Sequence, residues 1–268
     1  MDKKRIEELA EDPRFIPGIY NYCDRWCERC AFTSRCMSYA LSEDEFDSPQ
    51  ARDISNQAFW DKLVGIFATT LEMVKEKARE MGIDVDAIDL QEAAEQTERV
   101  HEAAQEQPYS RAAMKYIRMV DDWFKSNKGL LEDKAEELQT LVEAEVPGAK
   151  PADEAVSIHD CLEVIRWYQH QIYVKLCRAA SGVIRGEIEG LECVQEDADG
   201  SAKVALIGIE RSTAAWAGLL AHFPDQEHSL LNLLATLKRL LRQVESAFPN
   251  ARTFLRPGFD VDEKQPTG

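Results

Sequence analysis

The sequence predicts an all-α protein, a bundle of long helices preceded by a cysteine-rich loop. Three observations support this fold class. Ala, Leu, Glu, Gln, Lys and Arg, which favour helices, are frequent. The 268 residues include only 13 Gly and 10 Pro. Apolar residues recur every three to four positions and rarely alternate, as they would in half-buried strands.

The first long helix is expected over residues 58–81, where apolar residues recur on one helix face. These residues are Trp60, Leu63, Val64, Phe67, Leu71, Val74, Ala78 and Met81. Gly82 supplies the helix stop. Residues 86–107 are rich in Glu and Gln and have almost no apolar stripe. They suit either a solvent-exposed helix or a flexible connector.

A further helix begins at Pro108, because proline is favoured in the first turn, and it breaks near residues 127–129 before resuming. Residues 146–151, which include two prolines and a glycine, are predicted to be a linker. A long helix is expected over residues 152–184. Its first turn is acidic, which suits the helix dipole.

Residues 186–200 are expected to be irregular. Residues 202–223 are predicted to form a helix, although residues 203–209 alone would also suit a strand, because the apolar pattern is longer than a typical strand. The last helix is expected over residues 226–247, with leucines along one side.

The domain organisation follows from these segments. Residues 1–50 are interpreted as a cysteine-rich metal-binding segment packed on the bundle, residues 51–250 as the helical bundle, and residues 251–268 as a loose C-terminal tail. The formal charge of -17 opposes nucleic-acid binding, which requires a basic surface. No apolar run reaches the roughly 18–20 residues of a membrane span, and no secretory signal is apparent. We therefore expect a cytoplasmic protein that binds neither nucleic acid nor membranes.

The strongest functional motif is a cluster of cysteines spaced as C-x3-C-x2-C-x5-C. Its members are Cys23, Cys27, Cys30 and Cys36. Four thiolates suit a zinc ion or an iron–sulfur cluster, whereas disulfides are disfavoured in the cytosol and between positions this close in sequence. Zinc sites usually present two cysteine pairs separated by a longer loop. The spacing therefore favours a [4Fe–4S] cluster, with structural zinc or reduced thiols without metal as alternatives.

Part of this motif resembles a known cluster loop. The spacing Cys27-x2-Cys30-x5-Cys36 is similar to the closing half of the [4Fe–4S] loop in endonuclease III-type DNA glycosylases. The first spacing of the motif differs, and the helix-hairpin-helix motif of those enzymes is absent. The resemblance implies a cluster and no glycosylase activity.

The residues between the cysteines suit a bound anionic centre. Arg25, Arg29 and Arg35 are expected to bind the cofactor by supplying positive charge and N–H donors. Trp26 and Phe32 are expected to shield the centre from water.

A second candidate site is a polar stripe on the helix expected over residues 152–184. At about 100° per residue, six side chains lie near one line on this helix. They are His159, Glu163, Arg166, His170, Tyr173 and Cys177. Apolar residues flank this polar stripe on both sides, which predicts that it is buried against other protein.

His159, Glu163, His170 and Glu210 are therefore candidate catalytic residues, because inward-facing Glu and His side chains in a helical bundle suit metal binding or proton transfer. A buried carboxylate is costly unless it is paired or metal-bound. The structural alternative is a buried salt bridge from Arg166 to Glu163 or Glu210, with the histidines hydrogen-bonded at the edge.

Two functions agree with these features. The first is a redox or metal-dependent enzyme, in which the [4Fe–4S] cluster stabilises the His/Glu site or exchanges electrons with it and with a redox partner. The second is a non-enzymatic protein-interaction module whose four cysteines bind structural Zn²⁺. The sequence specifies no reaction or substrate.

Overall fold

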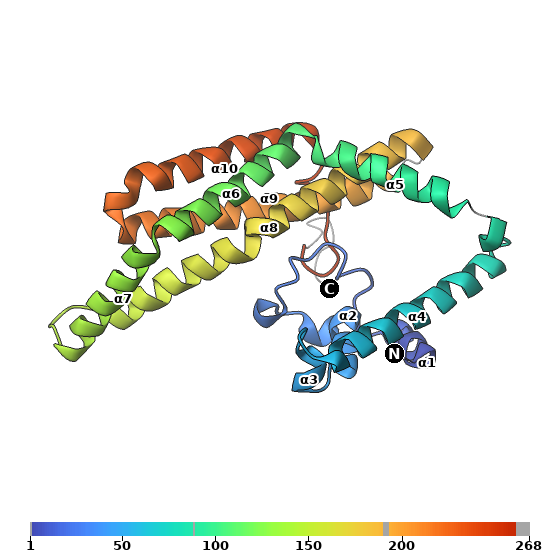
Figure 1. Ribbon diagram of the computed structural model, residues 1–268, viewed down its shortest axis with the longest axis horizontal. Helices are drawn as coiled ribbons and strands as arrows, with labels where there is room; N and C mark the ends of the chain where they lie inside the picture. Colours follow the sequence, from blue (N-terminus) through green and yellow to red (C-terminus); the bar gives the residue numbers. More distant parts are fainter. Residues whose placement is uncertain (1, 88, 190–192, 261–268) are drawn as a thin grey trace, which may run out of the picture. The chain divides into compact units, whose positions relative to one another are not determined.

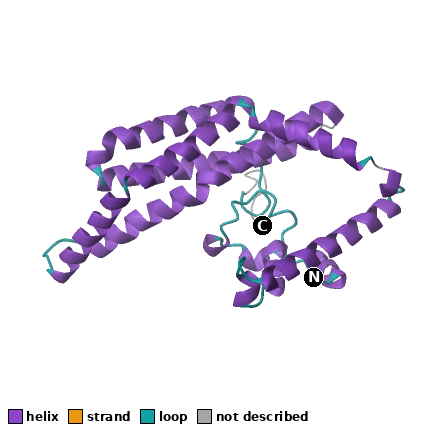
Figure 2. Ribbon diagram, in the orientation of Figure 1, coloured by secondary structure: helices purple, strands orange, loops and turns teal. Residues whose placement is uncertain are grey.

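The computed structural model describes residues 2–87, 89–189 and 193–260 (Figure 1). All regular secondary structure in these residues is helical, and they contain no strand (Figure 2). The predicted all-α class is therefore confirmed.

The chain divides into two compact units. The N-terminal unit comprises Met1–Thr97 together with Leu255–Gly268, and the bundle unit comprises Glu98–Phe254. The sequence predicts boundaries near residues 50 and 250 instead. The difference arises because the first long helix belongs to the N-terminal unit and because the chain returns to that unit after residue 254.

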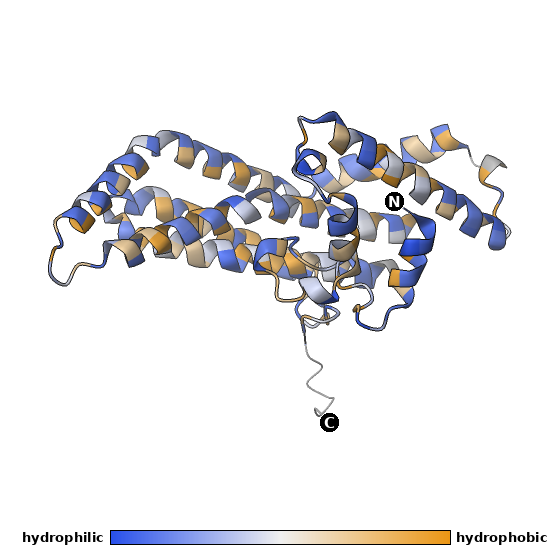
Figure 3. Ribbon diagram, turned by 90° about the horizontal axis from the view of Figure 1, so that it is seen from below, coloured by the Kyte–Doolittle hydropathy of each residue, from blue (hydrophilic) through white to orange (hydrophobic). Residues whose placement is uncertain are grey.

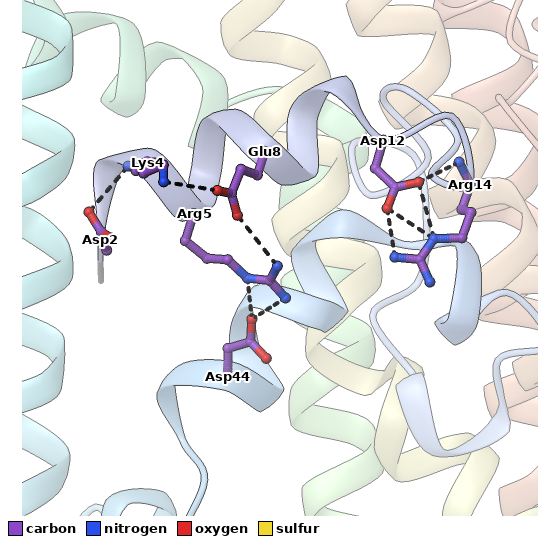
Figure 4. Close-up of polar contacts among 7 residues, drawn as sticks. All are labelled: Asp2, Lys4, Arg5, Glu8, Asp12, Arg14 and Asp44. Atoms are coloured by element: carbon purple, nitrogen blue, oxygen red, sulfur yellow. Dashed lines mark hydrogen bonds and ion pairs between the residues drawn. The ribbon is translucent and has the colours of Figure 1, made fainter.

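The N-terminal unit contains short helices and one long helix. They are α1 (Lys3–Glu11), η1 (Cys27–Arg29), η2 (Thr33–Arg35), α2 (Met37–Glu45), α3 (Pro49–Arg52), α4 (Gln57–Glu80), η3 (Val85–Ala87) and the first half of α5 (Leu90–Gln105). Asp2 caps α1 by accepting a hydrogen bond from the backbone N–H of Lys4. The Arg5 guanidinium donates to Asp44 at 2.9 Å and so joins α1 to α2 (Figure 4).

Helix α4 agrees with the predicted helix to within one residue at each end. Asn56 caps its start by accepting from the backbone N–H of Ala58, and Gly82, with φ +73°, follows its end. None of its residues is buried. The apolar face predicted on this helix is therefore exposed, and α4 is not part of the bundle core.

The bundle unit contains long helices that carry both hydrophobic and hydrophilic residues along their length (Figure 3). They are α6 (Pro108–Ser126), α7 (Lys128–Glu143), α8 (Pro151–Glu189), α9 (Cys193–His222) and α10 (Glu227–Ala247), with the short η4 (Pro224–Gln226). Helix α8 packs along α9, α9 against α10, α10 against α6, and α6 against α8, which closes a four-helix bundle. Helix α7 packs beside α8 (Figure 1).

Aromatic residues fill the centre of this bundle. Trp216 and Tyr116 are fully buried, and the Trp216 indole N–H donates to the Tyr116 hydroxyl at 3.0 Å. The Trp123 ring meets Trp216 edge-on at 5.0 Å. Gly208 allows close packing of α9 on α8, because a Cβ there would lie 2.9 Å from the Tyr168 ring.

Two further sequence predictions are resolved by these helices. The expectation that residues 186–200 are irregular is wrong for residues 186–189 and 193–200, which are helical, while residues 190–192 lie outside the described residues. The early turns of α9 are helical because they pack into the bundle, where Ala198 and Ala202 are fully buried. The polar segment 86–107 mostly forms a helix, α5, rather than a connector.

Helix α9 is also apolar enough, over Gln195–His222, to cross a membrane by length and composition. The sequence predicts no such run. Half of the most apolar stretch is buried inside the protein, between its neighbours α8 and α10. This burial is what the core helix of a bundle requires.

Candidate metal centre

Two short 3-10 turns position three of the four clustered cysteines. Cys27 begins η1 and Cys30 follows it, joined by a backbone hydrogen bond from the N–H of Cys30 to the carbonyl of Cys27 (3.2 Å). Cys36 follows η2 in the same way, bonded to the Thr33 carbonyl (3.2 Å), and it is the N-cap residue of α2. These two turns therefore hold Cys27, Cys30 and Cys36 in one compact loop.

The first cysteine is joined to this loop by a tight reversal of the chain. Arg25 has φ +58°, the left-handed region that non-glycine residues rarely adopt. The Asp24 carboxylate accepts a hydrogen bond from the backbone N–H of Trp26 at 3.3 Å and supports the turn. Such backbone strain tends to occur where a functional site fixes the chain.

All four clustered cysteines line one cavity of about 30 Å³. Burial raises the pKa of the Cys27 thiol, and Cys23, Glu28, Cys30 and Cys36 raise it further by their negative charge when ionised. Cys27 is thus within electrostatic reach of the other three cysteines.

The thiols share a cavity without adopting a ligand arrangement. The Cys23 Sγ donates to the Tyr20 carbonyl at 3.5 Å, and the Cys30 Sγ accepts from the backbone N–H of Phe32 at 3.4 Å. In the described part of the chain, no group of three or more His, Cys, Asp or Glu side chains is arranged to hold a metal ion. Metal binding would require the four thiols to lose their protons and Cys23 to give up its hydrogen bond to the Tyr20 carbonyl.

Aromatic and aliphatic side chains enclose this cavity. The lining includes Ile19, Tyr20, Trp26, Phe32, Thr33, Tyr39 and Phe259. Trp26 and Ile19 are buried. The sequence identifies the shielding residues Trp26 and Phe32 but misses Tyr20 and Tyr39, whose only signal is that they flank the motif. Phe259 carries no sequence signal, because it lies more than two hundred residues from the cysteines.

The C-terminal residues complete the enclosure. The Phe259 ring meets Phe32 edge-on at 5.0 Å, and Arg256 pairs with Asp260 at 3.0 Å. Gly258 has φ +78°, and a Cβ there would lie 2.8 Å from Ile16. Residues 255–260 are therefore packed in place, contrary to the predicted loose tail, whose last part, 261–268, lies outside the described residues.

The three arginines occupy different positions around the loop. Arg25 lines the cavity. The Arg29 guanidinium stacks on the Trp26 ring at 4.1 Å, and the exposed Arg35 contributes its carbonyl, which accepts from the backbone N–H of Ile16 (3.0 Å). Of the three predicted cofactor-binding arginines, the structure brings Arg25 to the thiols.

Most of the polar stripe on α8 is exposed, so its predicted burial is wrong. His159, Glu163, Arg166 and His170 are exposed, and the His159 Nδ1 lies 3.8 Å from the Glu163 carboxylate. Only the end of the stripe turns inward, where Cys177 is buried.

The reason lies in the two apolar flanks of that stripe. The flank with Ile165 and Ile172 packs into the bundle, whereas Val156 and Val174 on the other flank are 70% and 59% exposed. Because α8 buries only one flank, the stripe between the flanks points to solvent.

Glu210 is also exposed and has a structural partner. Arg252 binds its carboxylate at 2.7 Å and that of Glu245 at 2.7 Å. Arg166 instead pairs with Asp121 of α6 at 3.3 Å and stacks on Phe124 at 3.6 Å. The predicted buried salt bridge from Arg166 to Glu163 or Glu210 is therefore wrong.

The chain matches no family model, no curated protein and no solved structure in the comparisons made. The cavity lined by the four clustered cysteines is therefore the feature from which a function is inferred. Its residues come from both ends of the N-terminal unit.

Proposed function

We propose that the N-terminal unit binds a metal centre through Cys23, Cys27, Cys30 and Cys36, and that this centre is a [4Fe–4S] cluster. One observation carries the proposal, namely that all four clustered cysteines line a single cavity. Four thiolates from one loop are the ligand set of such clusters. The protein is then a cytoplasmic metal protein that exchanges electrons with a redox partner.

The other residues of the cavity support an anionic centre. The Phe32 N–H already donates to the Cys30 sulfur, and hydrogen bonds to cysteine sulfurs help to set the potential of a cluster. Trp26, Phe32 and Phe259 limit access of water, and Arg25 supplies positive charge at the cavity wall. A bound cluster would supply one-electron transfer.

Structural zinc is the second candidate, because four cysteine thiolates are also a ligand set of structural zinc sites. The protein is in that case an interaction module whose loop is held by Zn²⁺.

Purification without oxygen distinguishes the two candidates. An iron–sulfur protein is brown, absorbs broadly at about 400 nm and gives a paramagnetic signal after one-electron reduction. A colourless protein with one equivalent of zinc supports the second candidate. Protein that is folded and contains neither metal under these conditions contradicts the proposal.

Single substitutions test the ligands. Cys27→Ser should abolish metal binding, because Cys27 lies within reach of all the other three thiols. Cys161→Ser is the matched control, since Cys161 lies on α8 outside the motif and should keep the full metal content. Elemental analysis of both purified variants is the measurement. Equal metal content in the two variants would contradict the assignment of Cys27 as a ligand.

A further inference from the structure

Helix α4 carries an apolar face that its own N-terminal unit leaves exposed. Its exposed residues are Trp60 (46%), Val64 (66%), Phe67 (64%), Leu71 (55%), Val74 (58%) and, directly after the helix, Met81 (67%). A neighbouring face of the same helix is half-buried within the N-terminal unit, where the Phe59 ring lies 5.5 Å from Phe46. An exposed face of this size on a soluble protein indicates an interaction surface.

The spacing of this face is that of a coiled coil. Positions 60, 64, 67, 71, 74, 78 and 81 are separated alternately by four and three residues. This pattern repeats every seven residues and keeps a narrow apolar seam facing one partner helix. Three heptads fit on the 24 residues of α4, which is about 36 Å long at 1.5 Å per residue.

We propose that α4 of one chain pairs with α4 of a second copy, in the antiparallel direction, as a two-stranded coiled coil. The seam is self-complementary when the pair is centred between Phe67 and Leu71. Phe67 then packs against Leu71 of the partner subunit, and Val64 against Val74 of the partner subunit. Trp60, the largest residue, lies opposite Ala78 of the partner subunit, a small one, so the layers have similar volumes.

The charges beside the seam agree with the same register. Asp61 and Lys75 are exposed and occupy the same heptad position. In the antiparallel pair Asp61 lies opposite Lys75 of the partner subunit, and symmetry repeats this ion pair. In a parallel pair these residues are separated by about 21 Å along the axis and do not meet.

The net charge of α4 also permits self-association. The whole chain carries a formal charge of -17, which opposes the approach of two copies. Helix α4 has four basic residues and four acidic residues and is therefore neutral. This helix therefore adds no net charge of its own to the repulsion between copies.

Size-exclusion chromatography with light scattering, which measures the molar mass of the eluting protein, tests the proposal. At tens of micromolar the chain should have twice its mass of 30.4 kDa. Phe67→Lys should reduce the mass to that of one chain, because it places a charge in the central layers. Asp61→Lys should weaken the association about tenfold, since two favourable ion pairs become two unfavourable ones.

The reciprocal variant makes the register testable. Asp61→Lys combined with Lys75→Asp restores opposite charges only in the antiparallel pair, so it should recover the dimer. Glu72→Lys is the matched control, because it makes the same charge change on α4 away from the seam and should leave the dimer intact.

Three results would overturn the proposal. They are a single-chain mass for the unmodified protein at every concentration, a dimer that Phe67→Lys leaves intact, and a double charge reversal that remains as weak as Asp61→Lys.

Discussion

The Cys27 thiol couples the proposed metal centre to pH. Burial and the nearby thiols raise its pKa, so the metal-free loop holds this sulfur in its protonated form at neutral pH. A metal binds the thiolate and releases that proton. Metal affinity should therefore increase as the pH rises toward the pKa of the thiol.

Tyr116 gives a pH dependence to the stability of the bundle. Burial raises the pKa of its phenol from 10.0 to about 12. Because the pKa is higher in the folded state, the resulting stabilisation is fully present below pH 10 and is lost as the pH rises through 12. The free energy of unfolding should fall over this range, and it should fall less for Tyr116→Phe, whose side chain does not titrate.

Urea denaturation at a series of pH values measures this effect. Tyr109 and Tyr173, whose pKa values burial also raises to about 12, remain in both proteins and account for the residual slope. Parallel pH profiles for the unmodified protein and Tyr116→Phe would contradict the assignment.

Single exposed residues were the hardest to predict from the sequence. A helical wheel places His159, Glu163 and His170 on one line correctly, but it cannot decide which apolar flank of α8 is buried. That choice depends on where α6 and α9 pack, which local periodicity does not contain. The predicted burial of Glu210 is wrong for a similar reason. Its partner Arg252 lies after the last long helix, outside the helices from which the burial is predicted.

At the scale of elements, the long amphipathic helices could be predicted from their apolar spacing. Helices α4 and α10 agree with the sequence to within one residue at each end. Helices α1 and α2 are each nine residues long, too short for a strong periodic pattern, and were not predicted. The helical conformation of the early turns of α9 is not predicted, because their acidic composition is typical of a loop. Tertiary packing nevertheless buries Asp199 there.

Two glycine substitutions separate packing from helix propensity. Gly258→Ala should lower the free energy of unfolding by about 1–3 kcal/mol, because its φ is positive and its Cβ would press on Ile16. Gly65→Ala is the matched control within α4, where a Cβ meets nothing within 4 Å. It should raise stability by about 0.5–1 kcal/mol.

Denaturant titration gives both values. Hydrogen exchange should also show faster exchange of residues 255–260 in Gly258→Ala alone. Equal effects of the two substitutions would mean that residue 258 is not packed as described.

At the scale of the whole molecule, the two compact units have separate interiors. The bundle unit is held by aromatic and aliphatic packing around Trp216, whereas the proposed metal loop lies in the N-terminal unit. Removing the metal with a chelator should therefore increase hydrogen exchange in residues 20–45 and leave α8 and α9 protected.

The comparison requires protein whose metal content is known before and after chelation. Restoring the metal should restore protection of residues 20–45. An equal loss of protection in α8 would show that the two units unfold together, contrary to this expectation.

The wall contributed by Phe259 has a consequence for synthesis. Every residue of the bundle unit is translated before Phe259, yet the cysteines are translated before the bundle. The cysteine loop therefore lacks its Phe259 wall while more than two hundred further residues are synthesised. The cavity proposed to hold the metal therefore acquires its Phe259 wall only after the whole bundle unit has been synthesised.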